Sequence, residues 1–324
     1  MTSLPRIAIL DDSQHVARSS ADWSVLDGRA HLAILSAPFE SEDAAAAALQ
    51  DFEILVPMRE RTPLPGSLLE RLPRLKMIAL TGVRSPSLDL VACDRLDITV
   101  CNTAGDQVTP ATAELAFALI LAAARDLAHA DRRIREGGWH EHVRIGIPLA
   151  GKTLGVVGLG RLGKIVARYG KAFGMDVIAW SQNLTAEAAE EGGARLVSKA
   201  ELFSTADVVS LHLVLSARTR GVVGAAEINA LKPGAILVNT ARGPLIEREP
   251  FLARLRKGDL FAGLDVHDQE PMPKDDPFRS LPNVVLAPHL GYSTDAVFRQ
   301  FYGQSLENIL AFLDGKPIRL LKAG

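Results

Sequence analysis

The chain has 324 residues, 48% hydrophobic and 23% charged, a composition that fits a globular protein of roughly two domains. Its 36 basic and 38 acidic residues give a formal net charge of −2, so charge predicts neither a nucleic-acid partner nor a membrane partner. The N-terminus lacks the basic start and apolar core of a signal peptide, so we expect a cytoplasmic location.

The cysteines and the longest apolar run exclude two further classes of protein. Cys93 and Cys101 have no metal-ligand spacing, so we expect two buried thiols and no metal. The longest apolar run, residues 115–124, is about half of the roughly 20 residues that a membrane span needs. It predicts a buried helix instead.

The first third of the chain alternates short apolar strands with helical segments. This alternation is typical of βαβ units and a parallel sheet. Helices are expected over residues 41–50 and 66–71. The strands are expected over residues 6–10, 31–36, 53–57, 76–81 and 98–102.

A long helix is expected next, with Thr109 as its N-cap and Pro110 as its first residue. Residues 111–135 are rich in Ala and Leu, and Gly137 with Gly138 ends the pattern. The apolar character predicts burial on several sides, at a domain junction or at the interface of a homodimer.

A second βαβ series starts at Lys152 and ends with a helix over residues 294–314. Two successive doubly wound series predict two α/β domains with parallel sheets and a ligand-binding cleft between them. The strands of the second series are expected over residues 153–157, 176–180, 208–213, 235–239, 263–266 and 284–287.

The sequence GLGRLG at residues 158–163 lies between an expected strand and an expected helix, as a dinucleotide-binding loop requires. Gly158 permits a tight turn, Gly160 lets the backbone approach a pyrophosphate, and Gly163 lets helix and strand pack closely. The helix N-terminus then offers N–H groups to the phosphates. The alternative is a tight turn that binds nothing.

The residue that selects between NAD and NADP is expected near Ser181, at the end of the second strand. An acidic residue there binds the ribose hydroxyls of NAD and repels the 2′-phosphate of NADP. Residues 181–183 contain no Asp or Glu, and also no Arg or Lys. The cofactor can therefore be NAD or NADP, and NADP is expected to be tolerated.

Arg242, Glu270 and His289 each follow an expected strand, 28 and 19 residues apart. Reduction of a 2-keto acid needs a hydride, a proton for the carbonyl oxygen and a clamp for the carboxylate. Imidazole titrates near neutral pH, so His289 suits the acid–base role. Glu270 can fix the tautomer of His289 and favour its imidazolium. The planar guanidinium of Arg242 suits a carboxylate and a polarised carbonyl.

With GLGRLG and the segments at residues 238–243, 265–271 and 288–294, the sequence resembles the D-isomer-specific 2-hydroxyacid dehydrogenases. This family includes glyoxylate/hydroxypyruvate reductases and phosphoglycerate dehydrogenases, and the resemblance covers essentially the whole chain. It implies a flavodoxin-like substrate (catalytic) domain at residues 1–102 and 291–324. It also implies a Rossmann NAD(P)-binding domain at residues 103–290. The implied reaction is hydride transfer between a nicotinamide and a small 2-keto or 2-hydroxy acid such as glyoxylate or hydroxypyruvate.

The resemblance also implies roles for further residues and a homodimer. Backbone N–H groups of the loop at Gly82, Val83 and Arg84 are expected to bind the substrate carboxylate, with Arg84 either adding a cation or pointing to solvent. Arg242 belongs to the same substrate set. The residues expected to contact the cofactor are Gly158, Gly160, Arg161, Leu162, Gly163, Ser181, Thr109, Thr240 and Asp265.

Two other activities stay open at this point. A cofactor-sensing binding protein, like the transcriptional corepressors of this fold, can keep the same three residues. A phosphite-type dehydrogenase is a second alternative. Formate dehydrogenases of the family carry Gln where Glu270 stands, so Glu270 argues against formate. We expect no C-terminal regulatory domain of the kind found in many biosynthetic phosphoglycerate dehydrogenases.

Overall fold

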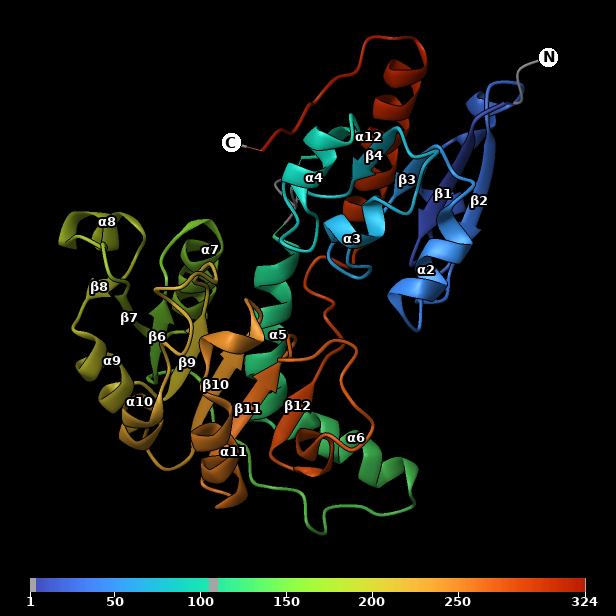
Figure 1. Ribbon diagram of the computed structural model, residues 1–324. Helices are drawn as coiled ribbons and strands as arrows, with labels where there is room; N and C mark the ends of the chain where they lie inside the picture. Colours follow the sequence, from blue (N-terminus) through green and yellow to red (C-terminus); the bar gives the residue numbers. More distant parts are fainter. Residues whose placement is uncertain (1–3, 105–109, 324) are drawn as a thin grey trace. The chain divides into compact units, whose positions relative to one another are not determined.

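The computed structural model describes residues 4–104 and 110–323 of the chain (Figure 1). The chain divides into two compact units. Unit 1 comprises Met1–Thr109 and Ser293–Gly324, and unit 2 comprises Pro110–Tyr292. Thr109, the expected N-cap and cofactor contact, lies outside the described residues. Each unit is an α/β fold around its own parallel sheet, as the alternating pattern predicts.

Unit 1 has a five-stranded sheet in the order β2-β1-β3-β4-β5, with all its pairs parallel. This is the flavodoxin-like order. Each expected strand is confirmed to within one residue at either end. The strands are β1 Arg6–Leu10, β2 His31–Leu35, β3 Ile54–Val56, β4 Met77–Leu80 and β5 Thr99–Asn102.

Helices cover both faces of this sheet, which is why its strands are predominantly apolar. One face carries α2 Glu42–Leu49, α3 Gly66–Leu69 and α4 Leu90–Arg95, whose buried side chains share one core with the strands. The expected closing helix is confirmed as α12 Asp295–Leu313, which packs on β4, β5 and α1 Ala17–Ser20. The short helix η1 Trp23–Leu26 adds an edge-to-face contact between Trp23 and Tyr302.

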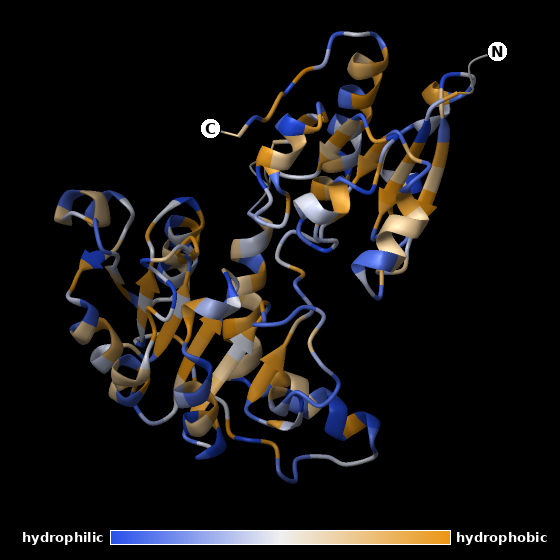
Figure 2. Cartoon of the chain, viewed as in Figure 1, coloured by the Kyte–Doolittle hydropathy of each residue, from blue (hydrophilic) through white to orange (hydrophobic). Residues whose placement is uncertain are grey.

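Unit 2 has a seven-stranded parallel sheet in the order β12-β11-β10-β9-β6-β7-β8. The strand order reverses between β6 and β9, which is the topological switch point where open α/β sheets bind ligands. The strands are β6 Thr153–Val157, β7 Asp176–Trp180, β8 Arg195–Leu196, β9 Val208–Leu211, β10 Ala235–Asn239, β11 Leu260–Leu264 and β12 Val284–Leu286. Figure 2 shows these strands as predominantly hydrophobic.

Apart from α5 and α6, which precede β6, the unit 2 helices connect successive strands. They are α7 Arg161–Ala172, α8 Ala186–Glu191, α9 Lys199–Thr205, α10 Ala225–Ala230 and α11 Arg248–Arg256, with short helices η2 Gly243–Leu245 and η3 Pro277–Ser280.

Cys93 and Cys101, both in unit 1, are buried and unpaired as expected. In the described part of the chain, no helix has the length and apolar character to cross a bilayer.

The expectation of one helix over residues 111–135 is wrong. The structure has α5 Ala111–Ala124 and α6 Leu127–Arg135, and Pro110 is the N-cap rather than the first helical residue. Asp126 interrupts the helix with a φ of 53°, a left-handed conformation that Asp tolerates. Its carboxylate accepts the backbone N–H of Arg144 at 2.9 Å and lies 3.2 Å from Nδ1 of His129. The apolar α5 packs on β10, β11, β12 and α7 within unit 2.

Three strands of unit 2 also differ from expectation. β9 ends at Leu211, two residues before the expected end. β11 starts at Leu260, three residues before the expected start, and ends at Leu264. The two-residue strand β8 was not predicted, because two residues carry no readable periodicity. It pairs with β7 through Arg195 beside Ile178 and Leu196 beside Ala179.

Candidate active site

Three neighbouring strands of unit 2 deliver the expected catalytic residues to one edge of the sheet. Arg242 follows β10, Glu270 follows β11 and His289 follows β12, and these strands are adjacent and parallel. Asn239 at the end of β10 pairs with Leu264, and Leu264 pairs with Leu286. The strands therefore end level with one another, and the polar segments after them emerge at the carboxyl edge where α/β sheets bind ligands.

Glu270 and His289 form a direct contact, with 2.5 Å between Oε2 of Glu270 and Nδ1 of His289. The second carboxylate oxygen of Glu270 accepts the backbone N–H of His267 at 2.9 Å. With both oxygens engaged, the carboxylate is fixed in orientation. An ionised Glu270 accepts a hydrogen bond from Nδ1–H of His289, which leaves Nε2 of His289 as the nitrogen that can exchange a proton with a ligand.

The charge state of Glu270 follows from its neighbours. Partial burial by itself raises the pKa of this carboxyl, but the hydrogen bond and charge of His289 and the N–H of His267 outweigh burial. The pKa of Glu270 therefore lies below its ordinary value. The carboxylate is ionised at neutral pH, as a partner for an imidazolium must be.

Asp265 supports the loop that carries His289. The Asp265 side chain is fully buried, and its two oxygens accept the N–H of Leu290 at 2.6 Å and of Gly291 at 2.9 Å. Its backbone carbonyl accepts the N–H of His289 at 2.8 Å. Burial raises the pKa of Asp265, although the N–H donors and the charge of His289 oppose this. The ring of Tyr292 meets that of His289 edge-on at 5.9 Å.

The Arg242 turn is fixed by hydrogen bonds and by a glycine. Nδ2 of Asn239 donates to the Arg242 carbonyl at 2.9 Å, and Nη1 of Arg242 donates to the Ala241 carbonyl at 2.7 Å. A Cβ on Gly243 would lie 2.5 Å from the carbonyl of His267. The Arg242 turn and the start of the Glu270 loop are thus in backbone contact, which only glycine permits.

The GLGRLG turn has the shape that a dinucleotide needs. Gly158 has a φ of 96°, and a Cβ there would lie 2.9 Å from the carbonyl carbon of His212, after β9. A Cβ on Gly163 would collide with the carbonyl oxygen of Gly158, so helix α7 and the turn are tightly packed. At Gly160 a Cβ would meet nothing within 4 Å. The turn is therefore open where a pyrophosphate would approach, beside the N–H groups of Arg161 and Leu162 in the first turn of α7.

Thr240 supplies a second observation that fits a cofactor. This residue is 6% exposed, yet its hydroxyl has no hydrogen-bond partner within the part of the chain that the structure describes. A buried hydroxyl normally has a partner, so a bound polar group is the simplest way to satisfy it. Ser181, directly after β7, is half-buried. No group of three or more His, Cys, Asp or Glu that could hold a metal ion occurs in residues 4–104 and 110–323.

The expected substrate loop lies in unit 1, after β4. Gly82 has a φ of 97°, and its N–H donates to Oγ1 of Thr103 at 2.7 Å. The backbone N–H groups of Val83 and Arg84 meet no acceptor among the described residues. Arg84 is exposed. The guanidinium of Arg59 occupies the space where a Cβ of Gly82 would be, so a cation lies directly on this loop.

Sequence reasoning missed several contacts of the site. They are the N–H of His267 on Glu270, the ring of Tyr292 on His289, and the N–H groups of the His289 loop on Asp265. The residues that make these contacts are of types that are common in loops. Their roles arise from contacts between segments that follow different strands, and a single sequence gives no local signal for them.

A sequence model described as the D-isomer specific 2-hydroxyacid dehydrogenase, NAD binding domain, matches residues 117–291. A glyoxylate reductase of Aeropyrum pernix is 40% identical over 257 residues, which cover 77% of this chain and 76% of the relative. A D-3-phosphoglycerate dehydrogenase of Methanocaldococcus jannaschii is 39% identical over 249 residues, 76% of this chain but 47% of the relative. The crystal structure of a phosphoglycerate oxidoreductase from Vibrio cholerae is similar with a TM-score of 0.91 and 37% identity, covering 96% of this chain and 100% of that one.

Proposed function

Because the chain belongs to the D-isomer-specific 2-hydroxyacid dehydrogenase family, we propose that it reduces glyoxylate, hydroxypyruvate or a similar small 2-keto acid. It is an NAD(P)-dependent oxidoreductase of CH–OH donors. The proposed catalytic residues are Arg242, Glu270 and His289. The observation that carries this proposal is the contact of 2.5 Å between Glu270 and His289 at the edge of the sheet that also presents Arg242.

The proposed mechanism assigns one task to each residue. A nicotinamide cofactor, when bound, would supply the hydride for the carbonyl carbon. His289, held at Nδ1 by Glu270, donates the proton from Nε2 to the carbonyl oxygen, and it accepts that proton in the reverse reaction. The guanidinium of Arg242 binds the substrate carboxylate and polarises the carbonyl. Ionised Glu270 stabilises the imidazolium of His289 before the proton is transferred.

Unit 1 is proposed as the substrate domain and unit 2 as the NAD(P)-binding domain. The unpaired N–H groups of Val83 and Arg84 in the described chain support a carboxylate at this loop. The guanidinium of Arg59 against Gly82 supports an anionic substrate as well. Exposed Arg84 can add a further cation when an anion is bound.

Within unit 2, we propose that the cofactor lies on Gly158, Gly160, Arg161, Leu162 and Gly163. The open space at Gly160 supports the pyrophosphate position. Thr240, with its unsatisfied hydroxyl, supports a further contact. Thr109 and Asp265 are proposed contacts on the nicotinamide side, on the resemblance to the family alone.

We propose that NADP is accepted. The residue after β7 is Ser181, which places no carboxylate against a 2′-phosphate. Steady-state kinetics with NADH and NADPH on one substrate tests this. A kcat/KM for NADH that exceeds that for NADPH by more than about a hundredfold, close to 3 kcal/mol of discrimination, would contradict it.

A cytoplasmic homodimer is proposed as the working form. Leu127 and Ile134 of α6 are 59% and 52% exposed, and Trp139 and Ile145 after it are 62% and 91% exposed. Apolar side chains gathered on one segment are typical of a protein interface. A second copy of this chain is the proposed partner. Light scattering that reports the mass of one chain would contradict the proposal.

A panel assay tests the proposed reaction. The protein is mixed with NADH or NADPH and a series of 2-keto acids, and oxidation of the cofactor is followed by absorbance. We expect turnover with glyoxylate or hydroxypyruvate, and loss of turnover in His289→Gln with cofactor binding retained. His31→Gln, at an exposed His of β2 in unit 1, is the matched control. Tight cofactor binding without turnover on any acid would favour the cofactor-sensing alternative.

A further inference from the structure

We infer that Arg248 is a positioning residue for the Glu270–His289 pair, because it holds both ends of the loop that carries Glu270. The inference rests on the proposed function, since it matters for activity only if Glu270 acts in the reaction. Arg248 is the first residue of α11, six positions after Arg242. It therefore connects the segment after β10 with the segment after β11.

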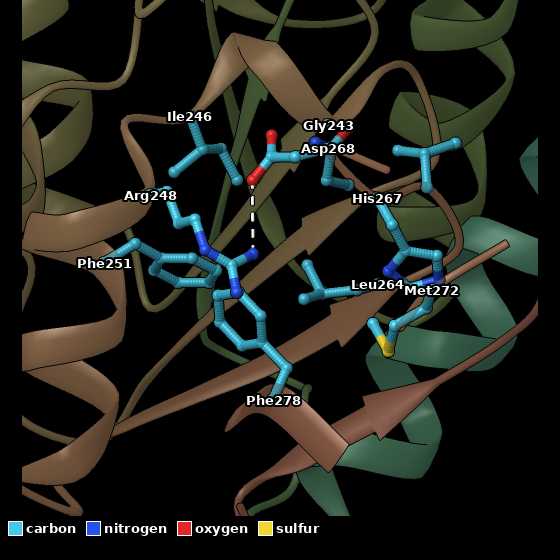
Figure 3. Close-up of a pocket in the computed structure, with 11 residues that line it drawn as sticks. Gly243, Ile246, Arg248, Phe251, Leu264, His267, Asp268, Met272 and Phe278 are labelled. Atoms are coloured by element: carbon cyan, nitrogen blue, oxygen red, sulfur yellow. Dashed lines mark hydrogen bonds and ion pairs between the residues drawn. The ribbon is translucent and has the colours of Figure 1, made fainter. Parts of the chain in front are cut away.

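The guanidinium of Arg248 binds two carboxylates on opposite sides of Glu270 in the chain. Nη1 lies 3.3 Å from Oδ2 of Asp268, and Nη2 lies 3.0 Å from Oδ2 of Asp276. Figure 3 shows Arg248 reaching Asp268, with Phe278 beside the guanidinium. Its central carbon is 4.9 Å from the centre of the Phe278 ring, a distance at which a cation–π contact adds to the ion pairs.

The two ion pairs of Arg248 differ in burial: the side chain of Asp268 is 38% exposed, as in an ordinary surface ion pair, whereas that of Asp276 is buried. The side chain of Asp276 is 9% exposed and that of Arg248 is 31% exposed. Asp276 also caps the short helix η3, since its Oδ1 accepts the N–H of Phe278 at 3.0 Å. Exposed ion pairs contribute little, but loss of one partner of a buried pair leaves the other charge uncompensated. Loss of Arg248 therefore destabilises the C-terminal end of the loop.

The cavity around Arg248 is small. Arg248, Asp268, Phe278 and Gly243 are among the residues that line it (Figure 3), and its volume is about 30 Å³. That space holds a water molecule or two, which is too small for a keto acid or a nicotinamide ring. Arg248 therefore acts through the loop.

The loop depends on these contacts because much of it is exposed. Asp268 and Glu270 lie at exposed positions, so apolar burial does little to fix them. Arg279 holds the far side of the loop through the carbonyls of Met272 and Pro273. Glu270 is only two positions after Asp268 in the chain, so an anchor at Asp268 restricts the backbone at Glu270. Release of Asp268 therefore frees Glu270 to move relative to His289.

Only an arginine suits this geometry. The planar guanidinium presents separate N–H groups to two carboxylates at once, whereas the ammonium of Lys is a single point charge. Lys at this position can keep one ion pair but not both in the same orientation. We therefore expect Arg248→Lys to recover part of what Arg248→Met loses.

The test is a double-mutant cycle in the full chain with Arg248→Met, Glu270→Gln and the double variant. A misplacement of about 1 Å in a catalytic group can cost up to about a hundredfold in rate, so we expect Arg248→Met to lower kcat about tenfold. We expect the KM and Kd for the cofactor to stay within about twofold, because the GLGRLG turn is untouched. In the Glu270→Gln background, Arg248→Met should change kcat by less than about twofold.

Arg254→Met is the matched control in the same helix. Arg254 is also an ion-paired arginine, 2.7 Å from Asp259, and it donates to the carbonyl of Leu231. We expect this variant to lower the Tm and leave kcat per folded active site unchanged. This outcome separates loss of stability from loss of Glu270 positioning.

The outcomes are distinguishable. If Glu270→Gln has wild-type kcat, the proposed function of the pair fails. If Glu270→Gln is impaired but Arg248→Met is not, the pair stands and the inference about Arg248 is overturned. If the two substitutions reduce kcat independently, so that the double variant shows the product of both losses, Arg248 does not act through Glu270 and the inference is also overturned.

Discussion

Gly243→Ala should impair the site without touching any of its functional side chains. A Cβ at this position would lie 2.5 Å from the carbonyl carbon and oxygen of His267, and 2.7 Å from the nitrogen of Asp268. Ordinary van der Waals contact begins at 3.4 Å, so the added carbon is about 0.9 Å too close. The atoms it meets belong to the backbone and cannot rotate away.

The magnitude follows from this overlap. Gly243 is not in the left-handed region, so the cost for alanine is steric rather than conformational. Forcing one carbon into a packed site costs about 1–3 kcal/mol of folding free energy. A displacement of about 1 Å between the Arg242 turn and the Glu270 loop should lower kcat by roughly 10- to 100-fold.

Thermal unfolding and steady-state kinetics measure both effects. Gly303→Ala is the matched control, because Gly303 lies inside α12 and a Cβ there would meet nothing within 4 Å. We expect Gly303→Ala to raise stability by about 0.5–1 kcal/mol, because alanine is the better helix former. Wild-type kcat and Tm in Gly243→Ala would refute the claim that these two segments are in backbone contact.

Three further predictions concern single side chains. Glu270→Gln should lower kcat by about a hundredfold. In the wild type, the acid limb of the kcat/KM profile should lie below the ordinary pKa of a Glu carboxyl, because the pKa of Glu270 is lowered in the folded protein. An acid limb above the ordinary pKa would contradict this. Burial lowers the pKa of His212 to about 4, so between about pH 6.5 and 4 the unfolded chain binds a proton that the folded chain does not. As the pH is lowered through this range, the free energy of unfolding should therefore fall by up to about 3 kcal/mol. Chemical denaturation at several pH values should show a smaller fall in His212→Gln, and an unchanged slope would refute the assignment. Ser181→Asp should shift the ratio of kcat/KM toward NADH by tenfold or more through repulsion of the 2′-phosphate, close to 1.4 kcal/mol, and an unchanged ratio would show that Ser181 does not face the ribose.

The sequence was sufficient where the signal is local. Apolar runs bounded by turn residues located the unit 1 strands to within one residue, because each run reflects burial of its own side chains. The glycines of GLGRLG were readable because a tight turn and a close helix packing each require a missing Cβ. The pairing of Glu270 with His289 was predicted from residue types, strand ends and the family resemblance.

Only the tertiary structure decided what depends on partners distant in the chain. The break at Asp126 comes with an N–H from Arg144, and the His289 loop is fixed by amides that bind Asp265. In the sequence, Arg248 has the features of an ordinary surface residue of a helix. Only the structure shows that it forms ion pairs with Asp268 and Asp276. The hydrophobic pattern of a segment reports its own burial, whereas an ion pair or a helix break depends on groups that meet only after the chain has folded.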